Sequence, residues 1–267
     1  MSFNTPQSIT ETIIEKIGVA KCELSLRQLI VLGFMAGAFI AFGSQLATRV
    51  LATVADPGLA MILAGAVFSV GLMLVIIAGA ELFTGNTLIW MSVLSGKTTL
   101  KKMLVNWIVV FFSNFAGTVF IAWLISQSGL LYGADGTLSV IGNKAVSIAA
   151  IKAGLPFFQV LIRGILCNWL VCLALWISLA SHDITGKIFG IFFPIMTFVA
   201  SGFEHNVANM YFLSVGMMID PATCITPGGF VNNLIAATLG NIIGGAFFVG
   251  TLYYYVYRKC ETCKSSQ

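Results

Sequence analysis

Two carboxylates that interrupt long uncharged runs constrain the fold of this chain more than any other feature. Residues 57–80 carry no charge, Glu81 follows, and the next charged residue is Lys97. A single helix through all of these residues would be about 60 Å long, twice the ~30 Å hydrocarbon thickness of a bilayer. The pattern returns about 120 residues later, where Glu204 interrupts the run 188–219. We therefore expect two membrane segments, each broken near its carboxylate, whose non-helical backbone is buried in protein or lines an aqueous cavity.

The residues around the two carboxylates indicate a duplication. Each carboxylate is followed five residues later by an asparagine, Asn86 in one case and Asn209 in the other. Further along, two asparagines eight residues apart are followed by a glycine three residues on: Asn106, Asn114 and Gly117, then Asn233, Asn241 and Gly244. We expect three membrane spans in each half. Because three is an odd number, the two halves must be inverted relative to each other in the membrane. Inverted repeats with two broken helices are typical of transport proteins whose site lies at the breaks.

Composition supports an all-α polytopic membrane protein. Of 267 residues, 58% are hydrophobic and only 9% are charged, against about 25% charged in soluble domains. We predict six transmembrane helices at about 28–48, 58–94, 103–126, 156–180, 188–218 and 230–257, with the second and fifth broken. These form a channel domain over 28–259, with repeats at about 28–127 and 155–258. A leader occupies 1–27 and a tail 260–267.

The distribution of lysine and arginine predicts the orientation. An even number of spans places both termini on one side, together with ten basic residues, against three on the other side and Arg163 within the fourth span. The ten are Lys16, Lys21, Arg27, Lys97, Lys101, Lys102, Lys187, Arg258, Lys259 and Lys264, and the three are Arg49, Lys144 and Lys152. Positive residues concentrate in cytoplasmic loops. We therefore expect an inner-membrane protein with cytoplasmic termini. The polar leader does not resemble a cleaved secretory signal.

The leader and the tail allow more than one interpretation. Ser8 and Glu11 match a helix capping box, with an apolar face following them. Such a helix could lie on the membrane surface or pack against its own protein. In the tail, Cys260 and Cys263 have a spacing used for metal or redox sites, but no second pair or nearby histidine accompanies them, so we expect reduced thiols and no metal. Arg163 has no explanation at this stage.

Four segments carry a resemblance to a known family. They are 79–85 (GAELFTG), 164–174 (GILCNWLVCLA), 201–209 (SGFEHNVAN) and 239–245 (LGNIIGG). In this order they resemble the signatures of the formate/nitrite transporter family, and the resemblance covers nearly the whole chain. It implies an aquaporin-like fold and a homopentamer with one pore per protomer. It also implies transport of small monovalent weak-acid anions such as formate, nitrite or hydrosulfide, without a cofactor or nucleic acid, and with protons as a further candidate partner.

The resemblance also assigns residues to the pore. It implies that His205 is the central histidine and that Thr84 faces it from the broken second span. It places Lys152 and Asn168 as polar groups near the outer approach. The side chains implied at the two apolar constrictions are Phe68, Leu72, Leu82, Phe83 and Phe198. Asn206 stands where family members often have serine, so the substrate stays open.

The residues themselves add chemical expectations. Imidazole titrates near neutral pH, so His205 could present a charge or a proton to a weak-acid anion. Glu81 and Glu204 would repel an anion, and we expect them instead to accept hydrogen bonds from backbone N–H groups where each helix restarts. Asn86 and Asn209 are expected to tie the broken segments to neighbouring helices.

Two other functional classes fit the sequence less well. The half-helix positions lack the paired Asn-Pro-Ala motif of aquaporins, which disfavours a neutral-solute channel. The sequence contains no metal cluster, nucleophile triad or phosphate loop, which argues against an enzyme. A passive channel and a proton-coupled carrier both remain open.

Overall fold

The computed structural model describes residues 3–220 and 225–258, and this part of the chain is helical throughout apart from its connections. Five helical stretches are long and apolar enough to cross a membrane. They are α3 (Leu26–Thr53), α4 with η2 (Pro57–Gly79), α7 (Leu100–Gln127), α9 (Phe157–Ala180) and the run Pro227–Tyr257, which comprises α12 (Pro227–Ile242), η3 (Ile243–Thr251) and α13 (Leu252–Tyr257). Two shorter apolar helices are α10 (Ile184–Ala200) and α11 (Asn206–Ile219). The all-helical membrane fold is therefore confirmed.

Both predicted breaks are present, and both are made in the same way. Gly79 has φ +87° and Gly202 has φ +71°, a left-handed conformation that glycine adopts without steric cost. In each case the carboxylate lies two residues after the glycine. The chain resumes as α5 (Phe83–Asn86) and, in the second half, as α11. The first break begins just before its carboxylate, because the chain leaves its helix at Gly79 and Ala80 is extended.

Equivalent helices cross closely in the two halves. Helix α3 packs along α7 in the first half, and α9 packs along α12 in the second. A Cβ atom added at Gly117 would lie 2.0 Å from the carbonyl oxygen of Phe34, and one added at Gly244 would lie 2.3 Å from that of Ile165. The glycine of each shared Asn-Asn-Gly pattern therefore lies where the two helices of a pair approach most closely.

The leader packs against its own protein. It consists of α1 (Pro6–Thr12), η1 (Ile13–Ile17) and α2 (Gly18–Glu23). Ile9 and Ile13 are buried in a cluster with Leu88, Met91 and Trp176, so the packing interpretation is confirmed. The capping box predicted at Ser8 was wrong, because the helix starts at Pro6 and Thr5 accepts the Ser8 N–H at 3.3 Å. Proline fits the first helical turn, where its missing N–H costs nothing.

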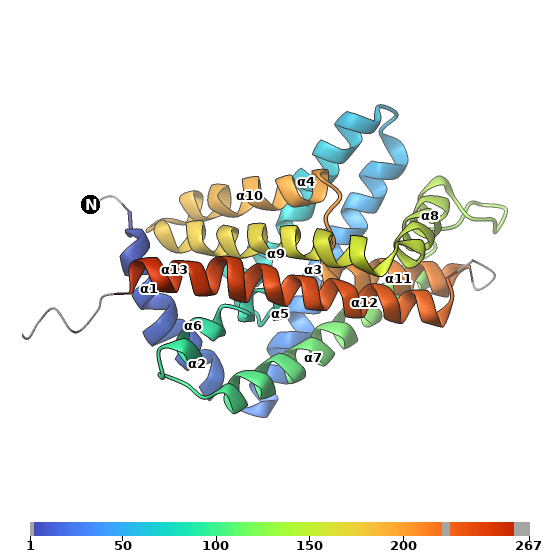
Figure 1. Ribbon diagram of the computed structural model, residues 1–267. Coiled ribbons are helices and arrows are strands. Elements are labelled where there is room, and N and C mark those ends of the chain that lie inside the picture. Colours follow the sequence, from blue (N-terminus) through green and yellow to red (C-terminus); the bar gives the residue numbers. More distant parts are fainter. Residues whose placement is uncertain (1–2, 221–224, 259–267) are drawn as a thin grey trace, which may run out of the picture.

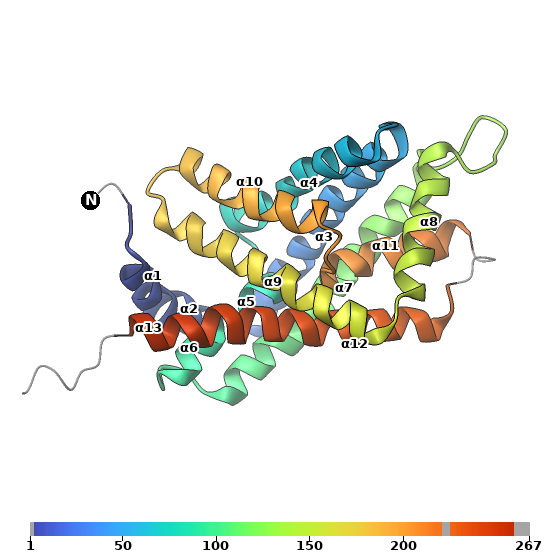
Figure 2. The same cartoon turned by 45° about the horizontal axis from the view of Figure 1, so that its top comes forward.

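The long polar connection contains a helix that we did not predict. The loop ends at Ser139, whose side chain caps α8 (Val140–Gly154). Helix α8 adjoins α11 and places Lys152 in its last turn. Figures 1 and 2 show α1, α2 and α13 at one end of the bundle and α8 at the other. Cys260 and Cys263 lie outside the described residues.

Candidate functional site

The first break is held by a closed ring of hydrogen bonds among four polar residues. Lys21 of the leader lies 2.6 Å from Glu81 (Nζ to Oε1). The Asn86 amide donates to Glu81 Oε2 at 2.7 Å and to Asn106 Oδ1 at 2.8 Å. Asn106 in turn donates to the carbonyl oxygen of Lys21 at 3.0 Å. The ring therefore joins the leader, the break and α7.

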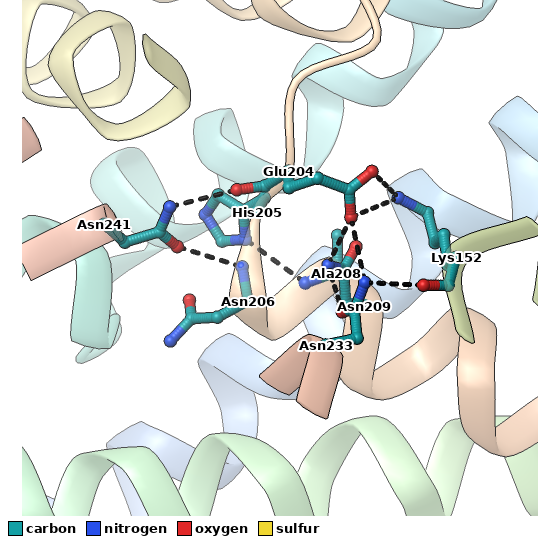
Figure 3. A network of polar contacts seen from close by, with 8 residues as sticks. All are labelled: Lys152, Glu204, His205, Asn206, Ala208, Asn209, Asn233 and Asn241. Carbon is teal, nitrogen blue, oxygen red and sulfur yellow. Dashed lines mark hydrogen bonds and ion pairs between the residues drawn. The ribbon is translucent and has the colours of Figure 1, made fainter. Parts of the chain in front are cut away.

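The second break is held by the same ring, built from the second half (Figure 3). Lys152 Nζ lies 2.9 and 3.0 Å from the two carboxylate oxygens of Glu204. Asn209 donates to Glu204 Oε2 at 2.6 Å and to Asn233 Oδ1 at 2.8 Å. Asn233 donates to the carbonyl oxygen of Lys152 at 2.9 Å. Lys21 is thus the counterpart of Lys152, and α2 plays in the first half the part of α8 in the second.

The carboxylates do not have the donors that we expected. Within the described residues no backbone N–H donates to Glu81 or Glu204, so that prediction was wrong. A lysine ammonium and an asparagine amide bind each carboxylate instead. These groups are only 7% and 3% exposed, and a buried carboxylate is far better compensated by an opposite charge than by a neutral amide. Sequence reasoning missed Lys21, although the duplication itself called for a lysine matching Lys152.

Two further asparagines satisfy the backbone at the breaks. Asn114 Oδ1 accepts the N–H of Phe83 at 2.9 Å, and its amide donates to the carbonyl oxygens of Gly33 and Glu81. Asn241 does the same in the second half, where Oδ1 accepts the N–H of Asn206 at 2.9 Å. Its amide donates to the carbonyl oxygens of Gly164 and Glu204. Backbone groups that would be unpaired at membrane depth are thereby paired.

The two breaks bring Thr84 and His205 together. Thr84 Oγ1 and His205 Nε2 lie 3.1 Å apart, and both residues are buried. The His205 side chain also caps α11, because its Nδ1 accepts the N–H of Ala208 at 3.2 Å. A ring nitrogen that accepts carries no proton, so in the neutral imidazole the proton is assigned to Nε2, which donates to Thr84. Within the described chain, the Thr84 hydroxyl has no other partner at hydrogen-bonding distance.

Asn168 lies beside this pair but turns its amide toward the protein. Its Nδ2 is 3.2 Å from the Thr84 carbonyl oxygen, 3.2 Å from Thr87 Oγ1 and 2.7 Å from the Asn241 carbonyl oxygen. The buried thiol of Cys172 lies 3.6 Å from the same Thr84 carbonyl oxygen. Asn168 therefore links α9 to elements of both halves at the level of the Thr84–His205 contact.

Two cavities lie at the breaks, and His205 lines the second of them. The first, about 510 Å³, is lined by Leu72 and Leu82 together with Lys21, Glu81 and further residues of the leader. The second, about 140 Å³, is lined by Phe68, Phe198 and His205 together with Lys152 and Glu204. Four of the five predicted constriction residues thus line one of these cavities. Phe83 lines neither, and its ring instead contacts Trp107 and Phe111 at centroid distances of 6.1 and 5.4 Å.

Two aromatic rings lie next to the histidine at the second cavity, one in contact with it and one behind. Phe198 stacks on His205 with a centroid distance of 5.9 Å and an interplanar angle of 22°. Phe68 meets Phe198 edge-on at 5.6 Å. The imidazole therefore lies between an apolar aromatic layer on one side and the hydroxyl of Thr84 on another.

Comparison with known proteins agrees with the geometry. A family model described as formate/nitrite transporter matches residues 7–255. The chain is 44% identical over 273 residues to the probable formate transporter of Methanothermobacter thermautotrophicus, covering 97% of this chain and 98% of that protein. It is 42% identical over 262 residues to the formate channel BtFdhC of Bacillus thuringiensis, again covering 97% and 98%.

Solved structures give the same result. A structure described as an FNT family ion channel has a TM-score of 0.84 at 33% identity and covers 92% of this chain and 99% of its own. A pentameric formate channel with formate bound has a TM-score of 0.76 at 33% identity, covering 88% and 98%. The proteins named here are transporters or channels, which indicates a transport protein rather than an enzyme. With matching signatures, two matching rings and relatives that span its length, this multi-pass membrane chain belongs to the formate/nitrite transporter family.

Proposed function

We propose that each protomer conducts small monovalent weak-acid anions, with formate, nitrite and hydrosulfide as the candidates, through a pore centred on His205. The observation that carries the proposal is the 3.1 Å contact between Thr84 and His205, made where the two broken segments meet. His205 lines the second cavity, and Leu82 and Gly85, on either side of Thr84 in the chain, line the first. Leu72 and Leu82 would form the apolar constriction on one side, and Phe68 and Phe198 that on the other.

The chemistry of the centre suits an anion that crosses apolar layers. An unaccompanied anion loses hydration there, which is costly unless hydrogen bonds or protonation compensate. The Nε2–H of His205 donates to the hydroxyl oxygen of Thr84. The hydroxyl hydrogen of Thr84 is then available to donate to an anion. Helix α11 begins at this point and presents the positive end of its dipole. A weak-acid anion that takes up a proton becomes neutral and passes the constrictions at lower cost, which is why passive and proton-coupled transport both remain candidates.

The family and the distribution of charges support a proposal for assembly and orientation. We propose a homopentamer in the inner membrane, in contact with lipid, with both termini in the cytoplasm. The pentameric neighbour supports the assembly, and the ten basic residues on the terminal side support the orientation.

Flux into proteoliposomes tests the proposal. Purified protein would be reconstituted, and uptake of formate, nitrite, hydrosulfide and chloride would be compared with uptake of glycerol and water under the same gradients. We expect the weak-acid anions to pass faster than chloride. Rapid glycerol or water flux with no anion flux would instead support an aquaporin-type neutral-solute channel.

A further inference from the structure

Each of the two cavities is lined by its own lysine–glutamate ion pair, and the first cavity is lined by one further charged residue. Lys187, in the first turn of α10, lines the 510 Å³ cavity. The ion pairs between described residues are Lys21–Glu81, Lys97–Glu15 and Lys152–Glu204. Lys187 takes part in none of them.

The charges that line each cavity can therefore be compared directly. The first cavity holds Lys21, Glu81 and Lys187, a net charge of +1. The second holds Lys152 and Glu204, which cancel, and His205, which is neutral in the tautomer that Ala208 imposes. Among the residues described, the carboxylate next to Lys187 in the chain is Asp183. It is exposed, accepts the N–H of Gly186 at 2.8 Å, and forms no ion pair with the lysine.

We propose that Lys187 is an anion-recruiting residue that gives the leader-side cavity a higher affinity for anions than the opposite cavity. The inference rests on the proposed anion transport and adds a difference between the two mouths of the pore. An unpaired charge in a concave mouth raises the local concentration of anions. It lies outside the constrictions, so it changes how often an anion arrives and leaves the barrier at the centre unaltered.

The position of Lys187 predicts which transport parameters a substitution changes and which it leaves unchanged. Lys187→Gln should raise the half-saturating anion concentration about two- to threefold for anions applied on the leader side, as expected for one charge roughly 6–9 Å from the anion in water. The maximal rate, and saturation from the opposite side, should stay the same. The effect should fade at high salt, where the Debye length falls to about 3 Å at 1 M. Side-specific recordings in planar bilayers, with formate or nitrite added to one chamber at a time, measure these quantities.

Two controls separate recruitment from general effects of charge or folding. Lys101→Gln removes the same charge on the same side, but Lys101 lines a different cavity, so it should leave saturation unchanged. Lys187→Cys allows chemical rescue, in which a positively charged thiol reagent restores the wild-type value and a negatively charged one raises it further. Wild-type protein treated with both reagents accounts for the native cysteines.

The outcomes distinguish this inference from the function on which it rests. If wild-type protein passes no anion, the proposed function fails. If wild-type protein passes anions but Lys187→Gln saturates like wild type from the leader side, or shifts saturation equally from both sides, recruitment by Lys187 is refuted.

Discussion

At the scale of single residues, His205 has two structural tasks that limit its chemistry. Its Nδ1 caps α11 through Ala208, and its Nε2 contacts Thr84. A second proton on Nδ1 must first displace the Ala208 N–H. Protonation of the imidazole at Nδ1 therefore breaks a hydrogen bond that caps the first turn of α11.

We predict that anion flux depends on external pH and that His205→Asn weakens this dependence more than Thr84→Ala does. Histidine is the side chain that ordinarily titrates between about pH 5 and 8. Asparagine can still cap a helix, so the variant removes the titrating group and keeps the cap. Thr84→Ala removes a hydrogen bond worth about 1 kcal/mol and should lower flux at every pH.

Formate or nitrite flux into liposomes, followed from acidic to mildly alkaline pH in the wild type and both variants, measures the effect. A pH profile of His205→Asn that overlays the wild type would assign the histidine a purely structural part.

At the scale of elements, asparagine side chains replace the backbone partners that each break removes. We predict that Asn114→Ala and Asn241→Ala lower stability by similar amounts, because each removes three buried hydrogen bonds. A buried group left unpaired costs about 1–3 kcal/mol. Thermal unfolding in mild detergent measures the loss, and Asn143→Ala, on the exposed surface of α8, serves as the control. A large effect in one half only would contradict the structural equivalence of the breaks.

Lys21 joins the leader to the channel domain through its ion pair with Glu81. We predict that Lys21→Met destabilises the protein, because it leaves the buried carboxylate of Glu81 without its partly buried counter-charge. Loss of one partner of a fully buried ion pair costs about 3–5 kcal/mol, which sets the upper limit here. Lys97→Met should cost less than about 1 kcal/mol, because its pair with Glu15 is exposed.

The double variant Lys21→Met/Glu81→Leu should recover much of the loss, since no unpaired charge remains. Equal unfolding temperatures for Lys21→Met and Lys97→Met would show that the leader ion pair is dispensable.

The main architecture could be predicted from the sequence because breaks and duplication leave local marks. Glu81 and Glu204 in uncharged runs predicted the breaks, and the shared asparagine spacing predicted the equivalent helices. The partners of the carboxylates could not be predicted in the same way. Lys21 is 60 residues from Glu81, and an ion pair over that separation has no periodic signature. Helix α8 was not predicted, because its small and polar residues are also typical of a loop. Packing against α11 stabilises it as a helix.

At the scale of the whole molecule, we predict a pentamer with one conducting pore per protomer. The similarity to a pentameric channel with formate bound is the basis. Mass measurement in mild detergent should give five times the protomer mass of 28.6 kDa. A stable monomer that still conducts anions after reconstitution would contradict the prediction.

The order of residues in each ring has a consequence for biosynthesis. In both halves the lysine precedes its carboxylate, by 60 residues for Lys21 and Glu81 and by 52 for Lys152 and Glu204. Each lysine therefore leaves the ribosome before its glutamate. Placing a lone acidic residue at the bilayer centre costs about 2.5–3.5 kcal/mol on insertion scales. Because the counter-charge has already been synthesised, each carboxylate can be neutralised as its segment enters the membrane, without waiting for the rest of the chain.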